Sequence, residues 1–157
     1  MKFLADGMLG KLARWLRMLG QDVIYSTELS DNELLDLAKV ECRVLLTKDF
    51  ELYKRAINRG LDSFYVEGKT EVERLAEVAK RYGVELVVDM DKSHCPICNT
   101  KLQAAPKEQL KDELEPNTYT YYDKFWKCPN CGQVYWQGAH WNQIDKTITQ
   151  AQQKNAI

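Results

Sequence analysis

Four cysteines in two matched pairs constrain this chain more than any other feature of its sequence. The pairs are the C-P-x-C motifs at residues 95–98 and 128–131. Four thiolates presented by two such turns favour the tetrahedral coordination that Zn²⁺ adopts in structural sites. A redox dithiol would need only a single pair at a strand-to-helix turn, and an iron centre is the other alternative. We therefore expect a zinc ribbon with no open coordination position, whose ligands are Cys95, Cys98, Cys128 and Cys131.

Before these motifs, the chain alternates between short apolar runs and amphipathic segments. Continuous apolar runs predict buried parallel strands, and a periodicity near 3.6 residues predicts helices. This alternation is typical of an α/β fold, in which helices cover both faces of a parallel sheet. The predicted strands are Lys2–Asp6, Asp22–Tyr25, Arg43–Thr47, Asp62–Val66 and Glu85–Val88, and the predicted helices are Leu9–Leu19, Asp31–Val40, Glu51–Arg59 and Glu71–Tyr82.

The pattern changes after Met90, which suggests two lobes. We assign residues 1–90 to the α/β domain, 91–145 to the β-rich zinc ribbon and 146–157 to a polar tail, expected to fray from residue 150 onward. The fifth cysteine, Cys42, begins an apolar run, and we expect it to lie in the core.

Composition limits the partners of the chain. The formal net charge is −1, so nucleic-acid binding would depend on a local basic patch. No apolar run approaches the roughly 20 residues of a membrane span. The first apolar run is also too short for a secretory signal, because it already ends at Asp6. We expect a cytoplasmic protein with no membrane partner, while the oligomeric state stays open.

Three aspartates are the candidate catalytic residues. Asp6 and Asp49 follow predicted strands, and Asp31 begins a predicted helix. Each could simply cap a helix, although Ser30 already provides the cap before Asp31. In a parallel sheet, however, all three positions lie at the edge where the strands end. Carboxylates gathered there would repel one another unless a cation neutralised them, and oxygen ligands suit Mg²⁺ or Mn²⁺. Thr47 could add a hydroxyl beside such an ion.

Basic and aromatic residues are candidates for nucleic-acid contact. Lys11, Arg14 and Arg17 fall opposite the apolar stripe of the first helix, and form either a solvated face or a ridge that grips phosphate. His140, which lies among aromatic residues, is either a structural partner of the zinc site or a nucleic-acid contact. His94 is expected to be structural.

Several of these segments together resemble a known family. They are residues 3–17, 31–35 and 45–49 and the two cysteine motifs, and the sequence is similar there to the Mut-seven carboxy-terminal RNase family. That family is a branch of the PIN-domain nucleases with an appended zinc ribbon. The resemblance implies a PIN-like sheet and metal-dependent ribonuclease activity, with Asp6, Asp31 and Asp49 at the acidic positions. PIN nucleases typically have a fourth acid, for which the candidates are Asp22, Glu28, Glu33 and Glu41.

The predicted function is therefore Mg²⁺- or Mn²⁺-dependent hydrolysis of RNA phosphodiester bonds, with the zinc ribbon and its aromatic residues orienting the RNA. One alternative is a non-catalytic adaptor that binds nucleic acid. Another is a phosphatase or phosphotransfer domain, which is disfavoured because the first strand ends in a lone aspartate. The sequence leaves open which RNA is cut, whether DNA is accepted, and whether cleavage is internal or terminal.

Overall fold

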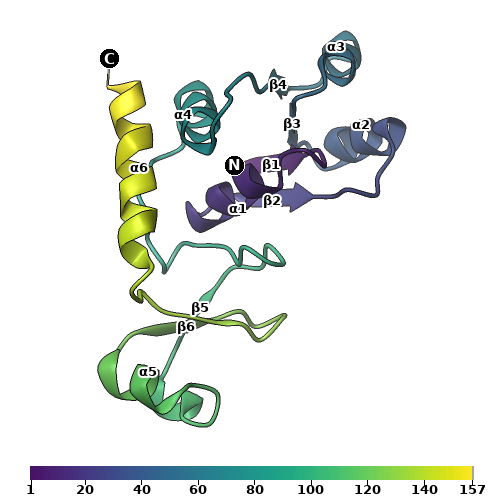
Figure 1. Cartoon of the computed structure of the whole chain (residues 1–157). Helices are drawn as coiled ribbons and strands as arrows, with labels where there is room; N and C mark the ends of the chain where they lie inside the picture. The colour runs from purple at the N-terminus through teal and green to yellow at the C-terminus, as the bar shows by residue number, and fades with distance from the viewer. Residues whose placement is uncertain (157) are drawn as a thin grey trace.

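The computed structural model describes residues 1–156, and its first lobe is a parallel sheet covered by helices (Figure 1). The strand order is β2-β1-β3-β4, and all neighbouring strands are parallel. The strands are β1 (Lys2–Ala5), β2 (Asp22–Tyr25), β3 (Val44–Thr47) and β4 (Ser63–Tyr65). The helices are α1 (Gly10–Met18), α2 (Asp31–Val40), α3 (Phe50–Asn58) and α4 (Glu71–Tyr82). The predicted α/β class and these eight elements are confirmed.

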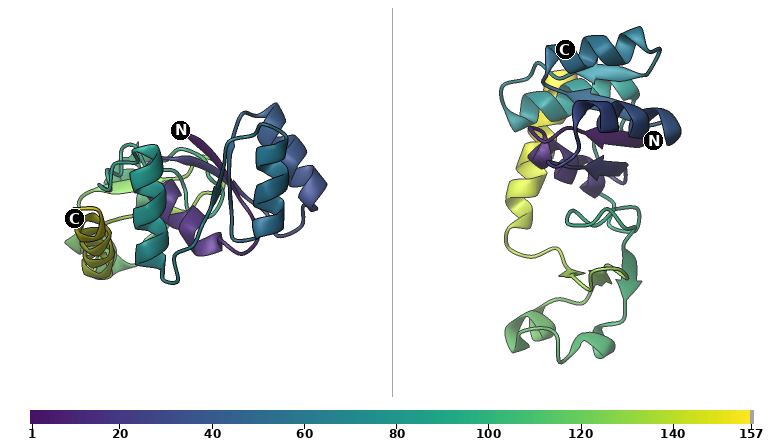
Figure 2. Two further views of the ribbon diagram at one scale, coloured as in Figure 1. Left: turned by 90° about the horizontal axis from the view of Figure 1, so that it is seen from above. Right: turned by 90° about the vertical axis from the view of Figure 1, so that its right-hand side faces the viewer.

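The sheet separates two apolar layers. Alternate residues of a strand point to opposite faces, so Phe3 and Ala5 enter one layer while Leu4 enters the other. Helices α1 and α4 pack on the Phe3 face, and α2 and α3 pack on the Leu4 face (Figure 2). Burial on both faces explains why β1 and β3 read as continuous apolar runs.

Polar side chains cap the starts of α2 and α4, and the cap at Ser30 was predicted. Ser30 and Glu33 form a complete capping box at α2, with both reciprocal hydrogen bonds present. Thr70 accepts a hydrogen bond from the Glu73 backbone at the start of α4. These bonds satisfy backbone N–H groups that the first helical turn leaves unpaired.

The second lobe is a small antiparallel sheet with the strand order β5-β6-β7 (Figure 2). Its strands are β5 (Gln103–Ala105), β6 (Phe125–Lys127) and β7 (Val134–Tyr135), and η1 (Lys107–Leu110) and α5 (Pro116–Tyr121) lie in the β5–β6 connection. The core of this lobe consists of two of the cysteines and three apolar side chains, namely Met90, Cys95, Leu102, Trp126 and Cys128.

The fifth predicted strand, Glu85–Val88, is wrong. This segment has no strand pairing, although Leu86 and Val88 pack against the first apolar layer. The side-chain amide of Gln152 donates a hydrogen bond to the Leu86 carbonyl at 2.7 Å. A side chain from the end of the chain therefore satisfies a backbone group that a strand neighbour would otherwise bond.

The prediction of a frayed polar tail is also wrong. Residues Trp141–Asn155 form helix α6, which lies beside α4 in both figures. Ile148 and Ala151 are buried in the first apolar layer, and the Asn155 amide donates to the Ala76 carbonyl at 2.9 Å. Sparse apolar residues at helical spacing are enough to dock this otherwise polar helix. Within residues 1–156, no helix is long and apolar enough to cross a membrane.

Cys42 is exposed, so the expectation of a core cysteine is wrong. Its φ is +54°, which places it in the left-handed region at the turn between α2 and β3. The apolar run begins only at Val44, and Cys42 occupies the turn that closes the preceding helix.

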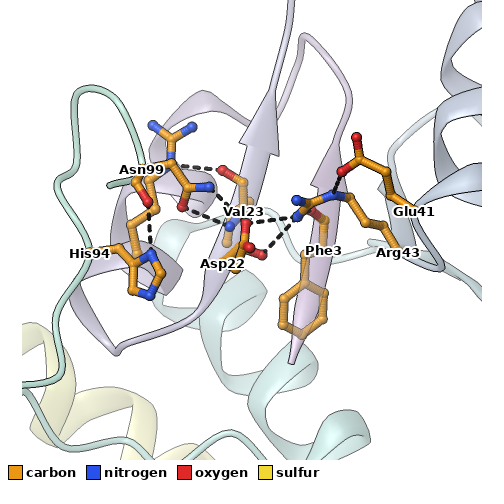
Figure 3. A network of polar contacts seen from close by, with 8 residues as sticks. Phe3, Asp22, Val23, Glu41, Arg43, His94 and Asn99 are labelled. Atoms are coloured by element: carbon orange, nitrogen blue, oxygen red, sulfur yellow. Dashed lines mark hydrogen bonds and ion pairs between the residues drawn. The ribbon is translucent and has the colours of Figure 1, made fainter. Parts of the chain in front are cut away.

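The two lobes meet along the outer edge of β2. The Asn99 side chain accepts a hydrogen bond from the Val23 backbone N–H at 2.9 Å and donates one to the Asp22 carboxylate at 2.7 Å (Figure 3). Arg43 donates to the same carboxylate at 2.8 Å and to the Phe3 carbonyl at 3.1 Å. Asn99 directly follows the first cysteine motif. Its hydrogen bonds therefore hold the zinc ribbon on the outer edge of β2.

Candidate active site and zinc site

Asp6 lies directly after β1, at the edge of the sheet where the strands end. Its backbone N–H still bonds the Leu46 carbonyl of β3, and its side chain is almost completely buried. One carboxylate oxygen accepts the Met8 backbone N–H at 3.0 Å. A buried carboxylate is costly unless it is paired, so the surroundings of Asp6 decide its role.

Thr47 connects Asp6 to Asp49. Its buried hydroxyl donates a hydrogen bond to the second carboxylate oxygen of Asp6 and accepts one from the Asp49 backbone N–H at 2.9 Å. The Asp49 side chain caps α3 through one oxygen, which accepts from Glu51 and Leu52. The other oxygen makes no hydrogen bond to any residue in the described range 1–156. Asp49 therefore caps a helix and also keeps one oxygen available for a ligand.

Asp31 lies at the first position of α2, at the same edge of the sheet. It is exposed, and its carboxylate is 3.7 Å from a guanidinium nitrogen of Arg55 on α3. Arg55 also donates a hydrogen bond to Asn32. Topology brings Asp31 to the expected edge, but its nearest cationic partner is an arginine that the sequence reasoning did not identify.

Two candidates for the fourth acid lie at the wrong end of the sheet. Asp22 starts β2, and Glu41 follows the carboxyl end of α2, so both belong to the opposite edge from Asp6. Both carboxylates pair with Arg43 there, at 2.8 and 2.7 Å. Glu28 and Glu33 lie between β2 and the first turn of α2, which keeps only these two on the edge that carries Asp6.

The carboxylates are not gathered as closely as the cysteines. Among the residues from 1 to 156, the cysteines are the only group of three or more potential ligands whose donor atoms all lie within 4.8 Å. The part of the acidic site that hydrogen bonds join together is thus the Asp6–Thr47–Asp49 group. It offers oxygen atoms of the type that Mg²⁺ and Mn²⁺ bind, and the assignment of Asp6, Asp31 and Asp49 to one ion stays a prediction.

Lys11 and Arg14 are exposed beside the loop that follows Asp6. They line an open cavity of about 370 Å³ together with Met8, Gly10, Glu71 and Arg74. Arg74 and Glu71 form an ion pair at 3.0 Å. The contribution of α4 to this basic surface cannot be predicted from sequence periodicity, because it depends on α1 and α4 lying side by side.

The placement of Arg17 on the exposed ridge is wrong, because its side chain is buried. Its guanidinium donates to the Val23 carbonyl at 2.9 Å and to the Pro96 carbonyl at 2.7 Å. At 100° per residue, Arg17 lies only about 40° around the helix from the buried Ala13. Its position on the flank of the apolar stripe lets it reach the zinc ribbon, where it acts as a bridge between lobes.

The four cysteine sulfurs form the geometry of a closed metal site. The Cys95–Cys131 and Cys98–Cys128 sulfur separations are 3.7 and 3.3 Å. Tetrahedral Zn²⁺ with bonds of about 2.3 Å requires sulfur separations of about 3.8 Å. The donor set and its spacing therefore fit a zinc ion, and four protein ligands leave no position for a substrate.

Polar groups support the sulfurs. The Tyr135 hydroxyl lies 3.1 Å from the Cys95 sulfur, and the Thr100 hydroxyl lies 3.5 Å from that of Cys98. Hydrogen bonds, of which the one with the Thr100 side chain has the largest effect, lower the pKa of Cys98 to about 5 despite the opposing effect of burial, with smaller contributions from Asn130 and Cys128. Such hydrogen bonds stabilise the thiolate form that a metal requires.

The two histidines have different surroundings. His94 is tied into the lobe interface, with its Nδ1 2.7 Å from the Asn99 carbonyl and its backbone N–H bonded to the Arg17 carbonyl. His140 is exposed just before α6 and lines an apolar cavity with Trp136 and Trp141. Its two predicted roles, a structural partner of the zinc site or an RNA contact, both stay predictions.

The aromatic residues of the ribbon divide into two groups. Phe125 and Trp126 are buried and belong to the structure of the lobe, whereas Tyr121 is 80% exposed at the end of α5. The sequence pattern alone could not separate them, because all belong to one aromatic-rich stretch.

Comparison with protein families gives one match that spans both lobes. The model described as Mut7-C RNAse domain matches residues 1–148, which include every residue of the acidic and zinc sites described above. No curated protein and no solved structure matches the chain.

Proposed function

Because the chain belongs to the Mut7-C RNAse domain family, we propose that it is a metal-dependent ribonuclease that hydrolyses RNA phosphodiester bonds. The observation that carries this proposal is the Asp6–Thr47–Asp49 group at the strand-end edge of the sheet. Asp6 and Asp49 hold Mg²⁺ or Mn²⁺, and Asp31 completes the site. Such a cation lowers the pKa of a water molecule and neutralises charge on the scissile phosphate.

The residues around the group have separate tasks in this proposal. Thr47 fixes the Asp6 carboxylate and the start of α3 with one hydroxyl. Lys11 and Arg14 attract the RNA backbone, because phosphate contacts supply most of the sequence-independent affinity. If Asp31 contacts the ion, Arg55 would share the Asp31 carboxylate with the ion or exchange it for another acceptor. The zinc ion has a structural role and takes no part in hydrolysis.

The decisive experiment is single-turnover cleavage of RNA with Mn²⁺, in which wild type is compared with Asp6→Asn. We expect the variant to be slower by at least about 100-fold, since a lost ligand costs at least as much as a lost outer-shell partner. Asp145→Asn, which changes an exposed aspartate on α6, is the matched control and should cut like wild type. Calorimetric titration with Mn²⁺ should show weaker binding for Asp6→Asn.

The same assay distinguishes the alternatives. An equal rate for wild type and Asp6→Asn would refute the proposed site. RNA binding without cleavage by wild type in Mg²⁺ or Mn²⁺ would support the non-catalytic adaptor. Phosphate release from small phosphoesters, with no RNA cleavage, would favour the phosphatase.

A further inference from the structure

An aromatic cluster borders the acidic site and has no role in the proposed chemistry. Phe50 is the first residue of α3 and follows Asp49 directly. Its ring centroid lies 5.3 Å from that of Tyr65 and 6.1 Å from that of Tyr53, and the two tyrosine rings are 6.0 Å apart. We call Phe50, Tyr53 and Tyr65 the aromatic cluster.

The cluster fixes the Phe50 ring without burying it. The Phe50–Tyr65 pair is edge-on, with an angle of 72° between ring planes, which is a favoured arrangement of aromatic pairs. Phe50 nevertheless remains 50% exposed, while both tyrosines are only partly buried. An aromatic ring that is held in place and still open to solvent can receive a flat ligand without first losing much side-chain entropy.

The position of the cluster is set by the same strands that build the acidic site. Tyr65 ends β4 and is the register partner of Thr47 on β3. Thr47 in turn hydrogen-bonds both Asp6 and the Asp49 backbone. A ligand on the Phe50 ring would therefore lie beside the start of α3, which Asp49 caps.

The charge beside the cluster also suits a nucleic acid. The Lys54 ammonium lies over the Phe50 ring, 5.4 Å from its centroid, and Lys48 precedes Asp49 in the chain. Lys54 also pairs with Glu51 at 3.5 Å, but both side chains are largely exposed, so this pair is weak and readily exchanged. A stacked base would place its own phosphate within reach of a cation.

We propose that the aromatic cluster stacks an unpaired nucleobase of the RNA next to the cleavage site, so that Phe50 makes single-stranded RNA the preferred substrate. This inference rests on the proposed ribonuclease function and adds the substrate class. Aromatic side chains bind the faces of unpaired bases with little sequence preference. Bases inside an A-form duplex are stacked on one another and cannot offer a face to Phe50.

The test is equilibrium binding of fluorescein-labelled single-stranded oligouridylate to the zinc-loaded protein in a buffer without added Mg²⁺ or Mn²⁺ and without chelator, followed by anisotropy, so that no cleavage is needed. Stacking contributes about 1–3 kcal/mol per base, so Phe50→Ala should weaken binding by about 5- to 150-fold. Phe50→Trp should bind like wild type. Ile57→Ala is the matched control, because it removes an exposed apolar side chain two turns along the same helix and should have no effect.

An abasic oligonucleotide of the same length should bind wild type and Phe50→Ala equally, and a duplex should be insensitive to the substitution. Unchanged oligouridylate binding by Phe50→Ala, or an equal loss with the abasic strand, would overturn the inference. A dimer that Phe50→Ala dissociates in sedimentation would overturn it too, by assigning the cluster to self-association. If Phe50→Ala weakens binding of the oligouridylate but not of the abasic strand, and wild type does not cleave RNA in Mn²⁺, the stacking inference stands and the proposed ribonuclease activity is refuted.

Discussion

The hydroxyl of Thr47, on β3, donates a hydrogen bond to the carboxylate of Asp6, which follows β1. Both groups are buried, and the same hydroxyl accepts the backbone N–H of Asp49. One threonine thus orients an acidic side chain on one strand and the start of the helix that follows another. This relationship leads to a prediction about both stability and activity.

Thr47→Val should destabilise the protein and reduce RNA cleavage. Valine keeps the shape of threonine but leaves the buried Asp6 oxygen without its donor, which costs about 1–3 kcal/mol. Chemical denaturation would measure the free energy of unfolding, and single-turnover cleavage with Mn²⁺ would measure the activity. Thr47→Ser keeps the hydroxyl and should retain most of the activity. Equal activity of the valine and serine variants would contradict an orienting role for the hydroxyl.

Lys11→Ala and Arg14→Ala should each weaken RNA binding in a salt-dependent manner. Both side chains are exposed beside the loop after Asp6, where they can contact phosphate. Each lost phosphate contact with a single strand should reduce the slope of log K against log salt concentration by about 0.7. Lys80→Ala, at the far end of α4, is the control and should leave the slope unchanged. An unchanged slope in the first two variants would show that the Lys11 and Arg14 side chains form a solvated face that does not contact RNA.

The sequence predicted much of this structure because local signals and burial agreed. Continuous apolar runs marked β1 and β3, since both faces of these strands are covered, and Ser30 marked the start of α2 through its own hydrogen bond. The spacing of the four cysteines indicated by itself that they form one group of potential metal ligands.

Apart from Cys42, which a local turn exposes, the failures concern residues whose partners lie far away in the chain. Arg17 looks like a surface charge until Pro96 is placed next to it, and α6 looks like a polar tail until α4 is placed beside Ile148. The aromatic cluster also needs the pairing of β3 with β4, because Phe50 and Tyr65 are adjacent only in space. Periodicity within one segment cannot reveal such contacts.

Arg17→Met should lower the free energy of unfolding by about 2–4 kcal/mol, because two carbonyls lose charged donors. The substitution keeps an apolar stem but breaks the bonds to Val23 and Pro96, which join α1 to β2 and the zinc ribbon. Arg14→Met, on the exposed face of the same helix, should change stability by less than about 0.5 kcal/mol. Denaturant titration of both variants measures the difference. Similar stability of the two variants would contradict the bridging role of Arg17.

Removal of zinc should unfold the second lobe. Metal-binding energy is folding energy in small thiolate sites, and two of the cysteines are part of the core of this lobe. In a Trp15→Phe background the three remaining tryptophans, all in residues 126–141, report on the ribbon and its junction with α6. Chelation should shift their emission to longer wavelength and release one zinc per chain. Cys128→Ser should show the shifted spectrum without chelation, whereas Cys42→Ser, at an exposed cysteine, should behave like wild type.

Acid should loosen the lobe interface through Asp22. Burial raises the pKa of this carboxyl, but hydrogen bonds from Arg43 and Asn99 lower it by more, so the folded-state pKa lies below the ordinary value of 3.8. A group with a lowered folded-state pKa stabilises the protein above its unfolded pKa, and this stability is lost as the pH falls through the folded pKa. Asp22→Asn should therefore be less stable than wild type at pH 7, by about 1–3 kcal/mol, and the difference should shrink below about pH 4. Denaturant titrations of the two proteins between pH 7 and pH 3 measure this difference. A gap in stability that stays constant over that range would show that the charge of Asp22 does not hold the interface.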